Sequence, residues 1–210
     1  MLNKIRHFYF NKYLVSPFCR KKYYLSYSFR FKALWFRVPK VGSRTIHQHF
    51  LDHSLPQEYI YSSRVGYLRE MYRSYFKFAF VRHPVDRLMS TWRNKVLEAN
   101  YFQFDPDEYL NMQSIEEFIS WLAAKNIHEV DEHLLPQTDL IDLSNLDFMG
   151  RFENFDNDLI HVAGAIGLPL EHVYHKNPST RTKIKVTRDL QVKIQEIYRQ
   201  DFNDLNYRID

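Results

Sequence analysis

Two segments of the sequence constrain the fold, because in each an apolar strand, a polar turn and an amphipathic helix follow one another. The first has a predicted strand at residues 34–38 and a helix starting near Thr45. The second has a predicted strand at residues 76–81 and a helix starting at Pro84. Strands that run directly into helices build α/β folds with parallel sheets. We therefore predict a single α/β domain with a P-loop-like central parallel β-sheet flanked by helices.

Other parts of the chain show the same kind of pattern. We predict a further strand at residues 146–153, with Asn154 as N-cap of the helix that follows, and helices at residues 115–122 and 187–199. With 210 residues, 45% of them hydrophobic, the chain can bury one substantial core. Repeats and low-complexity tracts are absent from the sequence.

The turn of the first segment contains Lys40, Gly42 and Ser43. Backbone N–H groups in such a turn, together with the partial positive charge of a helix N-terminus, suit a phosphate or sulfate group. We expect Lys40 to add a charge, and the hydroxyls of Ser43 and Thr45 to donate hydrogen bonds. The phosphate loop of ATPases is a different pattern, since there the lysine follows the glycines. An ordinary strand-to-helix turn remains the alternative.

The second segment places Arg82 directly after its strand and Ser90 further along its helix. An arginine can hold a phosphate through two parallel N–H bonds. Ligands of open α/β sheets bind beyond the carboxyl ends of the strands. Two such anion sites indicate a nucleotide with two separated phosphate groups.

These residues resemble the two nucleotide-binding motifs of sulfotransferases that use 3′-phosphoadenosine-5′-phosphosulfate (PAPS), in particular the carbohydrate sulfotransferases of the chondroitin and HNK-1 type. Residues 39–43 look like the family's 5′-phosphosulfate loop, and residues 81–95 look like its 3′-phosphate motif. Later stretches at residues 131–137, 146–154 and 198–207 also resemble family motifs. Family loops commonly carry Thr or Ser where this chain has Arg44, so Ser43 is the favoured hydroxyl contact and Thr45 the second choice.

The resemblance implies sulfonate transfer from PAPS, as co-substrate, to an acceptor hydroxyl on a carbohydrate or another molecule, with no metal required. The implied cofactor-binding residues are Lys40, Val41, Gly42, Ser43, Arg44, Thr45, Arg82 and Ser90. Related enzymes close a late basic loop over the nucleotide, so Arg181 and Lys183 are further candidates for the 3′-phosphate. The implied domain division is a basic aromatic segment at residues 1–33 and a sulfotransferase domain at residues 34–210.

Sulfonate transfer needs a group that stabilises charge on the leaving phosphate and a base that accepts the hydroxyl proton. Lys40 is the predicted stabiliser. His133 is the favoured general base, because it lies in a family-like stretch; the open rivals are His53, Glu70 and Glu132. We expect His83 and Arg87 to have structural roles.

Charge is unevenly distributed along the chain. Residues 1–51 contain eleven Lys or Arg and no acidic residue, and the remainder has a balance of −7. The basic start is either a solvated tail or a surface that attracts a membrane or a polyanionic substrate; nucleic acid is not an expected partner. Only one cysteine, Cys19, is present, and no apolar run is long enough to span a bilayer. We therefore predict a cytoplasmic enzyme, although the eukaryotic enzymes that the chain resembles are usually anchored in the Golgi membrane.

Two other functions remain open. A nucleotide-dependent kinase of the P-loop type would use a similar strand, loop and helix, but should have a glycine-rich loop before its lysine and an acidic magnesium ligand. A non-catalytic relative that binds nucleotide or glycan would keep the fold and Arg82 but lose Lys40 or the base. The presence of Lys40 favours an active enzyme.

Overall fold

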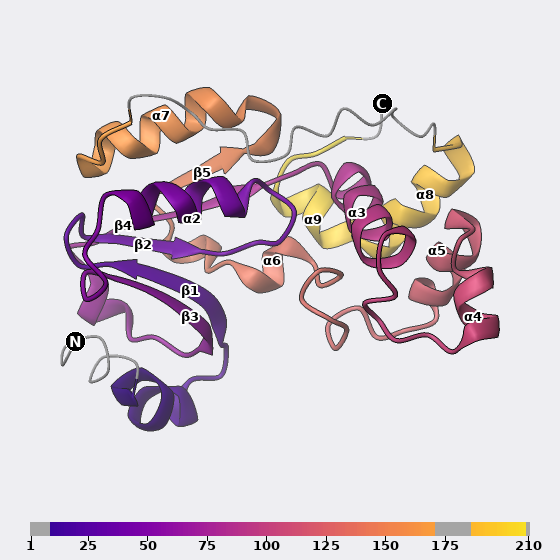
Figure 1. Cartoon of the computed structure of the whole chain (residues 1–210), viewed down its shortest axis with the longest axis horizontal. Helices are drawn as coiled ribbons and strands as arrows, with labels where there is room; N and C mark the ends of the chain where they lie inside the picture. The colour runs from indigo at the N-terminus through magenta and orange to yellow at the C-terminus, as the bar shows by residue number, and fades with distance from the viewer. Residues whose placement is uncertain (1–8, 171–185, 209–210) are drawn as a thin grey trace. The chain divides into compact units, whose positions relative to one another are not determined.

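The computed structural model of the chain describes residues 9–170 and 186–208. Two compact units make up an α/β domain with a mixed central sheet and flanking helices (Figure 1). Among the described residues, unit 1 comprises residues 9–81 and 140–170, and unit 2 comprises residues 82–139 and 186–208.

Unit 1 contains a five-stranded sheet with the strand order β3-β1-β2-β4-β5. Its strands are β1 (Tyr23–Ser28), β2 (Ala33–Phe36), β3 (Tyr59–Val65), β4 (Phe76–Val81) and β5 (Phe148–Arg151). Its α-helices are α2 (Ser43–Asp52) and α7 (Phe155–Ile166), and its short π- or 3₁₀-helical pieces are Phe10–Val15, Ser16–Phe18, Arg69–Tyr72, Leu143–Asn145 and Phe152–Asn154.

The sheet is mixed, so the prediction of a parallel sheet is right for only part of it. Strands β2, β4 and β5 are parallel neighbours, whereas β1 is antiparallel to both β2 and β3. Only residues 29–32 join β1 to β2, and a connection of this length cannot cross over to a parallel strand. The strand β1 lies within residues 1–33, where the sequence pattern suggested only a basic aromatic segment.

Aromatic side chains hold helices to the sheet. On one face, Phe50 of α2 stacks near Tyr59 and Phe78, with ring centroids 5.2 and 6.3 Å apart. Phe155 of α7 packs on Phe80 of β4, two residues after Phe78 and therefore on the same face, with centroids 5.2 Å apart. Aromatic stacking and edge contacts of this kind add to the stability that comes from burying the rings. The packing fixes α2, and with it the loop that leads into it.

The predicted elements of unit 1 are largely confirmed. β4 has the predicted bounds, and α2 buries Ile46, His49 and Phe50, the side on which the sequence placed its apolar residues. The predicted strand at residues 146–153 is shorter, because residues 152–154 form a 3₁₀ turn. Asn154 precedes α7, but its side chain donates to Asp158 at 2.8 Å and makes no capping hydrogen bond.

Unit 2 is helical. Its helices are α3 (Pro84–Trp92), a π-helical continuation at Arg93–Leu97, α4 (Pro106–Asn111), α5 (Ile115–Ala123), α8 (Arg188–Ile197) and α9 (Arg199–Asp204); α6 (Gln137–Leu140) begins in this unit. The predicted helix starts at Pro84 and Ile115 are confirmed, and the predicted helix at residues 187–199 is α8.

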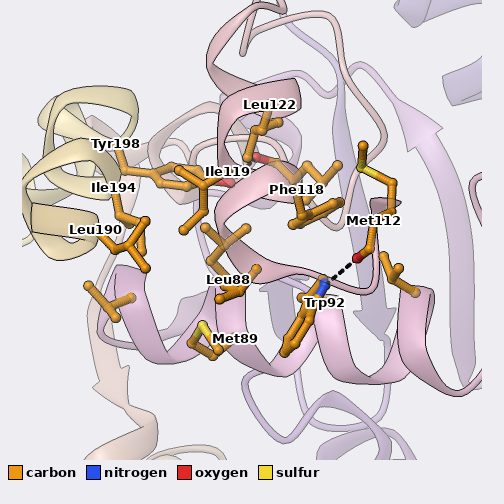
Figure 2. Packing of buried hydrophobic residues seen from close by; sticks show 14 of the residues in the cluster. Leu88, Met89, Trp92, Met112, Phe118, Ile119, Leu122, Leu190, Ile194 and Tyr198 are labelled. Carbon is orange, nitrogen blue, oxygen red and sulfur yellow. Dashed lines mark hydrogen bonds between the residues drawn. The ribbon is translucent and has the colours of Figure 1, made fainter. Parts of the chain in front are cut away.

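The core of unit 2 forms where α3, α5 and α8 present their apolar sides to one another. Phe118, Ile119 and Leu122 of α5 are fully buried, as their helical spacing predicted, and pack with Leu88 of α3 (Figure 2). The indole N–H of Trp92 donates to the Met112 carbonyl at 2.9 Å, so its polar group is satisfied inside this core. This core holds α3, the helix that follows Arg82.

Candidate functional site

The first part of the candidate site is the Lys40 loop, residues 38–42, which joins β2 to α2 in unit 1. Lys40 and Gly42 both have left-handed backbone conformations, with φ of +71° and +82°. Alternation of ordinary and left-handed residues turns successive N–H groups toward one side and is typical of backbone anion sites. The first turn of α2 contains no acidic residue. The loop is therefore suited to an anion.

Gly42 is required by its surroundings as well as by its φ. A Cβ added to Gly42 would lie 2.5 Å from Cε2 of Phe155, a distance that real Cβ atoms do not tolerate. Phe155 is itself held against Phe80. Phe155 of α7 thus packs directly against Gly42 and restricts the conformation of the Lys40 loop. No local sequence signal indicated this contact between Gly42 and Phe155.

The hydroxyl and basic residues after the loop have different environments. Ser43 Oγ donates to the Val38 carbonyl at 2.6 Å, so this hydroxyl closes the loop. Thr45 is buried and Arg44 is exposed, both in the first turn of α2. Val41 is fully buried, which leaves its backbone as the part that can contact a ligand. The six predicted residues, Lys40 to Thr45, form the end of the loop and the first turn of α2, and their contact with the nucleotide stays a prediction.

The second part of the candidate site begins at Arg82, which follows β4 and is half-buried. Pro84 occupies the first position of α3, where its missing N–H is not needed. Ser90 is half-buried on the same helix, six residues after Pro84, so about 9 Å of helix axis separates the two positions. No described contact joins Ser90 to Arg82, so its predicted role stays a prediction.

His83 and Arg87 have the structural roles that the sequence predicted. The ring Nε2 of His83 lies 2.8 Å from the Arg208 carbonyl oxygen. Arg87 is buried and donates to the carbonyls of Leu135 and Glu132 at 2.8 and 3.3 Å. Burial lowers the pKa of Arg87 from its ordinary value, and hydrogen bonds to these two carbonyls help to offset its loss of solvent. Arg87 therefore holds the backbone on both sides of His133 through these two hydrogen bonds.

His133 lies in a setting typical of a general base. Its Nδ1 is 2.7 Å from Oδ1 of Asp131, and its side chain is 15% exposed. Burial acts to raise the pKa of Asp131, but hydrogen bonds from His133 outweigh it, so the pKa lies below its usual range. A carboxylate on Nδ1 orients an imidazole and favours the tautomer whose Nε2 accepts a proton. The spacing Asp131-x-His133 was a signal for this pair that the sequence analysis did not use.

An aromatic ring lies next to His133, and a lysine lies over that ring. The ring of Tyr101 meets the imidazole edge-on at 5.3 Å between centroids, and Nζ of Lys95 lies 3.6 Å from the centre of the Tyr101 ring. Thr91 Oγ1 donates to the His133 carbonyl at 3.2 Å. The backbone and ring of His133 are thus held from α3 and from the residues that follow it.

The rival bases have different environments. His53 follows the last residue of α2, so about 15 Å of helix separates it from Ser43 at the other end. Glu70 is exposed in the 3₁₀ turn Arg69–Tyr72. Glu132 is half-buried beside His133 and remains the closest rival in sequence. Arg181 and Lys183, proposed as late contacts, and Lys4 and Arg6 of the basic start lie outside the described residues.

Within residues 9–170 and 186–208, no group of three or more His, Cys, Asp or Glu side chains is arranged to hold a metal ion. In the same part of the chain, every helix is too short or too polar to cross a membrane.

Comparison with known proteins shows to which protein family the chain belongs. A model of the sulfotransferase family matches residues 25–208, so the chain belongs to the sulfotransferase family. Both the Lys40 loop and Arg82 lie within the matched region.

Several curated relatives are carbohydrate sulfotransferases. The chain is similar to carbohydrate sulfotransferase 14 of Danio rerio, with 27% identity over 66% of this chain and 44% of that protein. Carbohydrate sulfotransferase 14 of Homo sapiens is 26% identical over 57% of this chain and 36% of its own length. Carbohydrate sulfotransferase 11 of Rattus norvegicus is 26% identical over 65% and 48%. The chain spans less than half the length of these relatives, and no solved structure matches it significantly.

The fit between Gly42 and Phe155 leads to a prediction. Gly42→Ala should lower stability and weaken nucleotide binding, because a left-handed alanine costs about 1–2 kcal/mol and its Cβ meets the Phe155 ring. Thermal unfolding and titration with 3′-phosphoadenosine-5′-phosphate (PAP) measure the two effects. Gly164→Ala in α7 is the control, since its Cβ meets nothing within 4 Å and should stabilise the helix. Equal behaviour of the two variants would contradict the assigned role of Gly42.

Proposed function

We propose that this protein transfers the sulfonate group of PAPS to a hydroxyl of a carbohydrate. The observation that carries the proposal is the arrangement of two anion-binding segments on parallel strands within a chain of the sulfotransferase family. The Lys40 loop follows β2, and Arg82 follows β4, its parallel neighbour. The names of the relatives support a carbohydrate acceptor.

The Lys40 loop is proposed to bind the 5′-phosphosulfate in a P-loop-like manner. The backbone N–H groups of the loop and of the first turn of α2 would hold the phosphate oxygens, with Arg44 adding charge from the exposed side of the helix. Ser43 closes the loop through its bond to Val38 and so keeps these groups in place. Arg82 is proposed to hold the 3′-phosphate through its guanidinium, with Ser90, Arg181 and Lys183 as additional contacts.

The reaction breaks the bond between the sulfonate sulfur and the bridging oxygen of the nucleotide, and forms a bond from the acceptor oxygen to the same sulfur. The electron pair of the broken bond stays on the 5′-phosphate, where Lys40 stabilises the new charge. The acceptor proton passes to Nε2 of His133, and Asp131 stabilises the imidazolium that forms. The products are PAP and a sulfated carbohydrate, and no step needs a metal ion.

The nucleotide preference tests the proposal. PAP should bind more tightly than adenosine 5′-phosphate, and Arg82→Ala should remove most of that difference, because the extra affinity comes from the 3′-phosphate. Isothermal titration of the full chain without metal measures both ligands. Arg82→Lys should recover only part of the difference, since lysine cannot form the paired bonds of a guanidinium. Preference for magnesium-ATP, or an equal affinity for both adenosine ligands, would reject the proposal.

Lys40→Ala should lower the rate of sulfonate transfer by roughly 10²–10³, the usual effect of removing one preorganised donor to a developing charge. The affinity for PAP should change less, because the backbone of the loop still binds the phosphate. Transfer of ³⁵S from labelled PAPS to a panel of unsulfated polysaccharides measures the rate. Lys193→Ala, a substitution of an exposed lysine of α8 outside the basic start of the chain, is the control. A variant lacking Lys40 that keeps the full rate would exclude this role.

His133→Gln should lower the same rate by about 10²–10⁴, the range of general-base catalysis, and leave the affinity for PAP unchanged. His128→Gln is a matched control, because Nδ1 of His128 is also paired with a carboxylate, 2.6 Å from Asp139, but its side chain is 54% exposed. The control should keep the rate. If Glu132→Gln loses activity and His133→Gln keeps it, the base is Glu132.

A further inference from the structure

Gln137 makes an unusual contact with Arg82. The Arg82 N–H donates to Oε1 of Gln137 at 2.9 Å, and Nε2 of Gln137 donates to the Arg82 carbonyl at 2.8 Å. The side-chain amide therefore pairs with both backbone groups of one residue, as a neighbouring strand would do. Gln137 is completely buried. It continues the pairing of the chain for one residue beyond the end of β4.

Asp201 of α9 holds Gln137 from the other side. Oδ2 of Asp201 accepts from the Gln137 N–H at 2.9 Å and from its Nε2 at 3.3 Å. Oδ1 accepts from the N–H and from the hydroxyl of Thr138, each at 3.0 Å. Asp201 is fully buried, and all four groups facing its oxygens are donors. A side chain 64 residues away in the sequence thus determines where the Gln137 amide lies.

The orientation of the Gln137 amide follows from its partners. The Arg82 carbonyl and the Asp201 carboxylate can only accept, so the NH₂ group must face both of them. The remaining oxygen then faces the Arg82 N–H. A carboxylate in place of this amide would set the oxygen that replaces Nε2 against two other acceptors, the Arg82 carbonyl and the Asp201 carboxylate, in a region where an unpaired polar group is costly.

The rest of this segment is held in the same way. The Tyr198 hydroxyl donates to the Leu134 carbonyl at 2.8 Å, and Arg87 donates to the Leu135 carbonyl at 2.8 Å. Both side chains are buried. Buried hydrogen bonds thus hold residues 131–138, and within this segment Gln137 bonds to the backbone of Arg82.

We propose that Gln137, held by Asp201, is a positioning residue for Arg82 and thereby sets the preference of the site for a nucleotide with a 3′-phosphate. The inference rests on the proposed function, in which Arg82 binds that phosphate. A guanidinium forms paired hydrogen bonds with a phosphate only in a narrow range of orientations. The position of the Arg82 backbone sets where its side chain starts and therefore which orientations the guanidinium can reach. Gln137 fixes that backbone through two hydrogen bonds, and its own side chain is fully buried.

The test compares PAP with adenosine 5′-phosphate in calorimetric titrations of the full chain. Gln137→Glu, which has the same shape, should weaken PAP binding by roughly 10- to 100-fold, the range found for outer hydrogen-bond partners of metal ligands. The affinity for adenosine 5′-phosphate should stay within about twofold, a difference of less than 0.5 kcal/mol. Gln137→Met, which removes the amide at similar length, should act in the same direction if the charged variant does not fold.

A double-mutant cycle separates positioning from a general loss of structure. In the Arg82→Ala background, Gln137→Glu should have almost no further effect on PAP binding, because the group that it positions is gone. Tyr198→Phe is the matched control, since it removes a buried hydrogen bond to the same segment at Leu134 but none to Gln137 or Arg82. It should lower the melting temperature and keep the preference for PAP.

The outcomes distinguish the two proposals. If the unaltered protein shows no preference for the 3′-phosphate, the proposed function fails. If it shows the preference and folded Gln137 variants keep it, only the positioning role is wrong. Equal weakening of both ligands by Gln137→Glu, or a similar loss of preference in Tyr198→Phe, would also overturn that role.

Discussion

The parallel pairing of β2 with β4 is the constraint on which the rest of the structure depends. The two strands lie in register from Ala33 and Phe76 to Phe36 and Ala79, and the rings of Trp35 and Phe78 stack nearly parallel at 6.1 Å. Both strands are almost entirely buried, as parallel strands covered on both faces must be. Because parallel strands end at the same edge, the chain leaves this pair twice in the same direction, once into the Lys40 loop and once into Arg82.

The conformation of each segment that follows these two strands depends on residues that are distant in sequence. The Lys40 loop takes its form from Gly42, whose missing side chain makes room for Phe155 of α7. Arg82 is paired through its backbone with Gln137, which Asp201 holds in turn. In both cases a buried, well-packed group outside the motif stabilises one conformation of the motif. Binding sites that are organised before the ligand arrives lose less conformational entropy on binding.

The two units stabilise their parts in different ways. Unit 1 relies on aromatic rings that pack α2 and α7 on the sheet, such as Phe50 on Tyr59. Unit 2 combines an apolar core around Phe118 with buried polar groups, of which Arg87 and Asp201 are charged types. Buried charges are tolerated because each meets several hydrogen-bond partners. These polar contacts are directional, so they specify the path of residues 131–138 more closely than apolar packing would.

The sequence alone determined the family and most of the helices, and it predicted two anion-binding segments. These depend on local patterns: the strand at residues 76–81, the helix start at Pro84, and the apolar spacing from Ile115 to Leu122. It did not reveal β1 and β3, whose antiparallel pairing depends on which strands meet in space. Nor did it reveal that Phe155 fits against Gly42, or that Asp201 reaches Gln137 across 64 residues. Contacts of this kind leave no periodic signal in the sequence, so only the tertiary structure decided how the motifs are held in position.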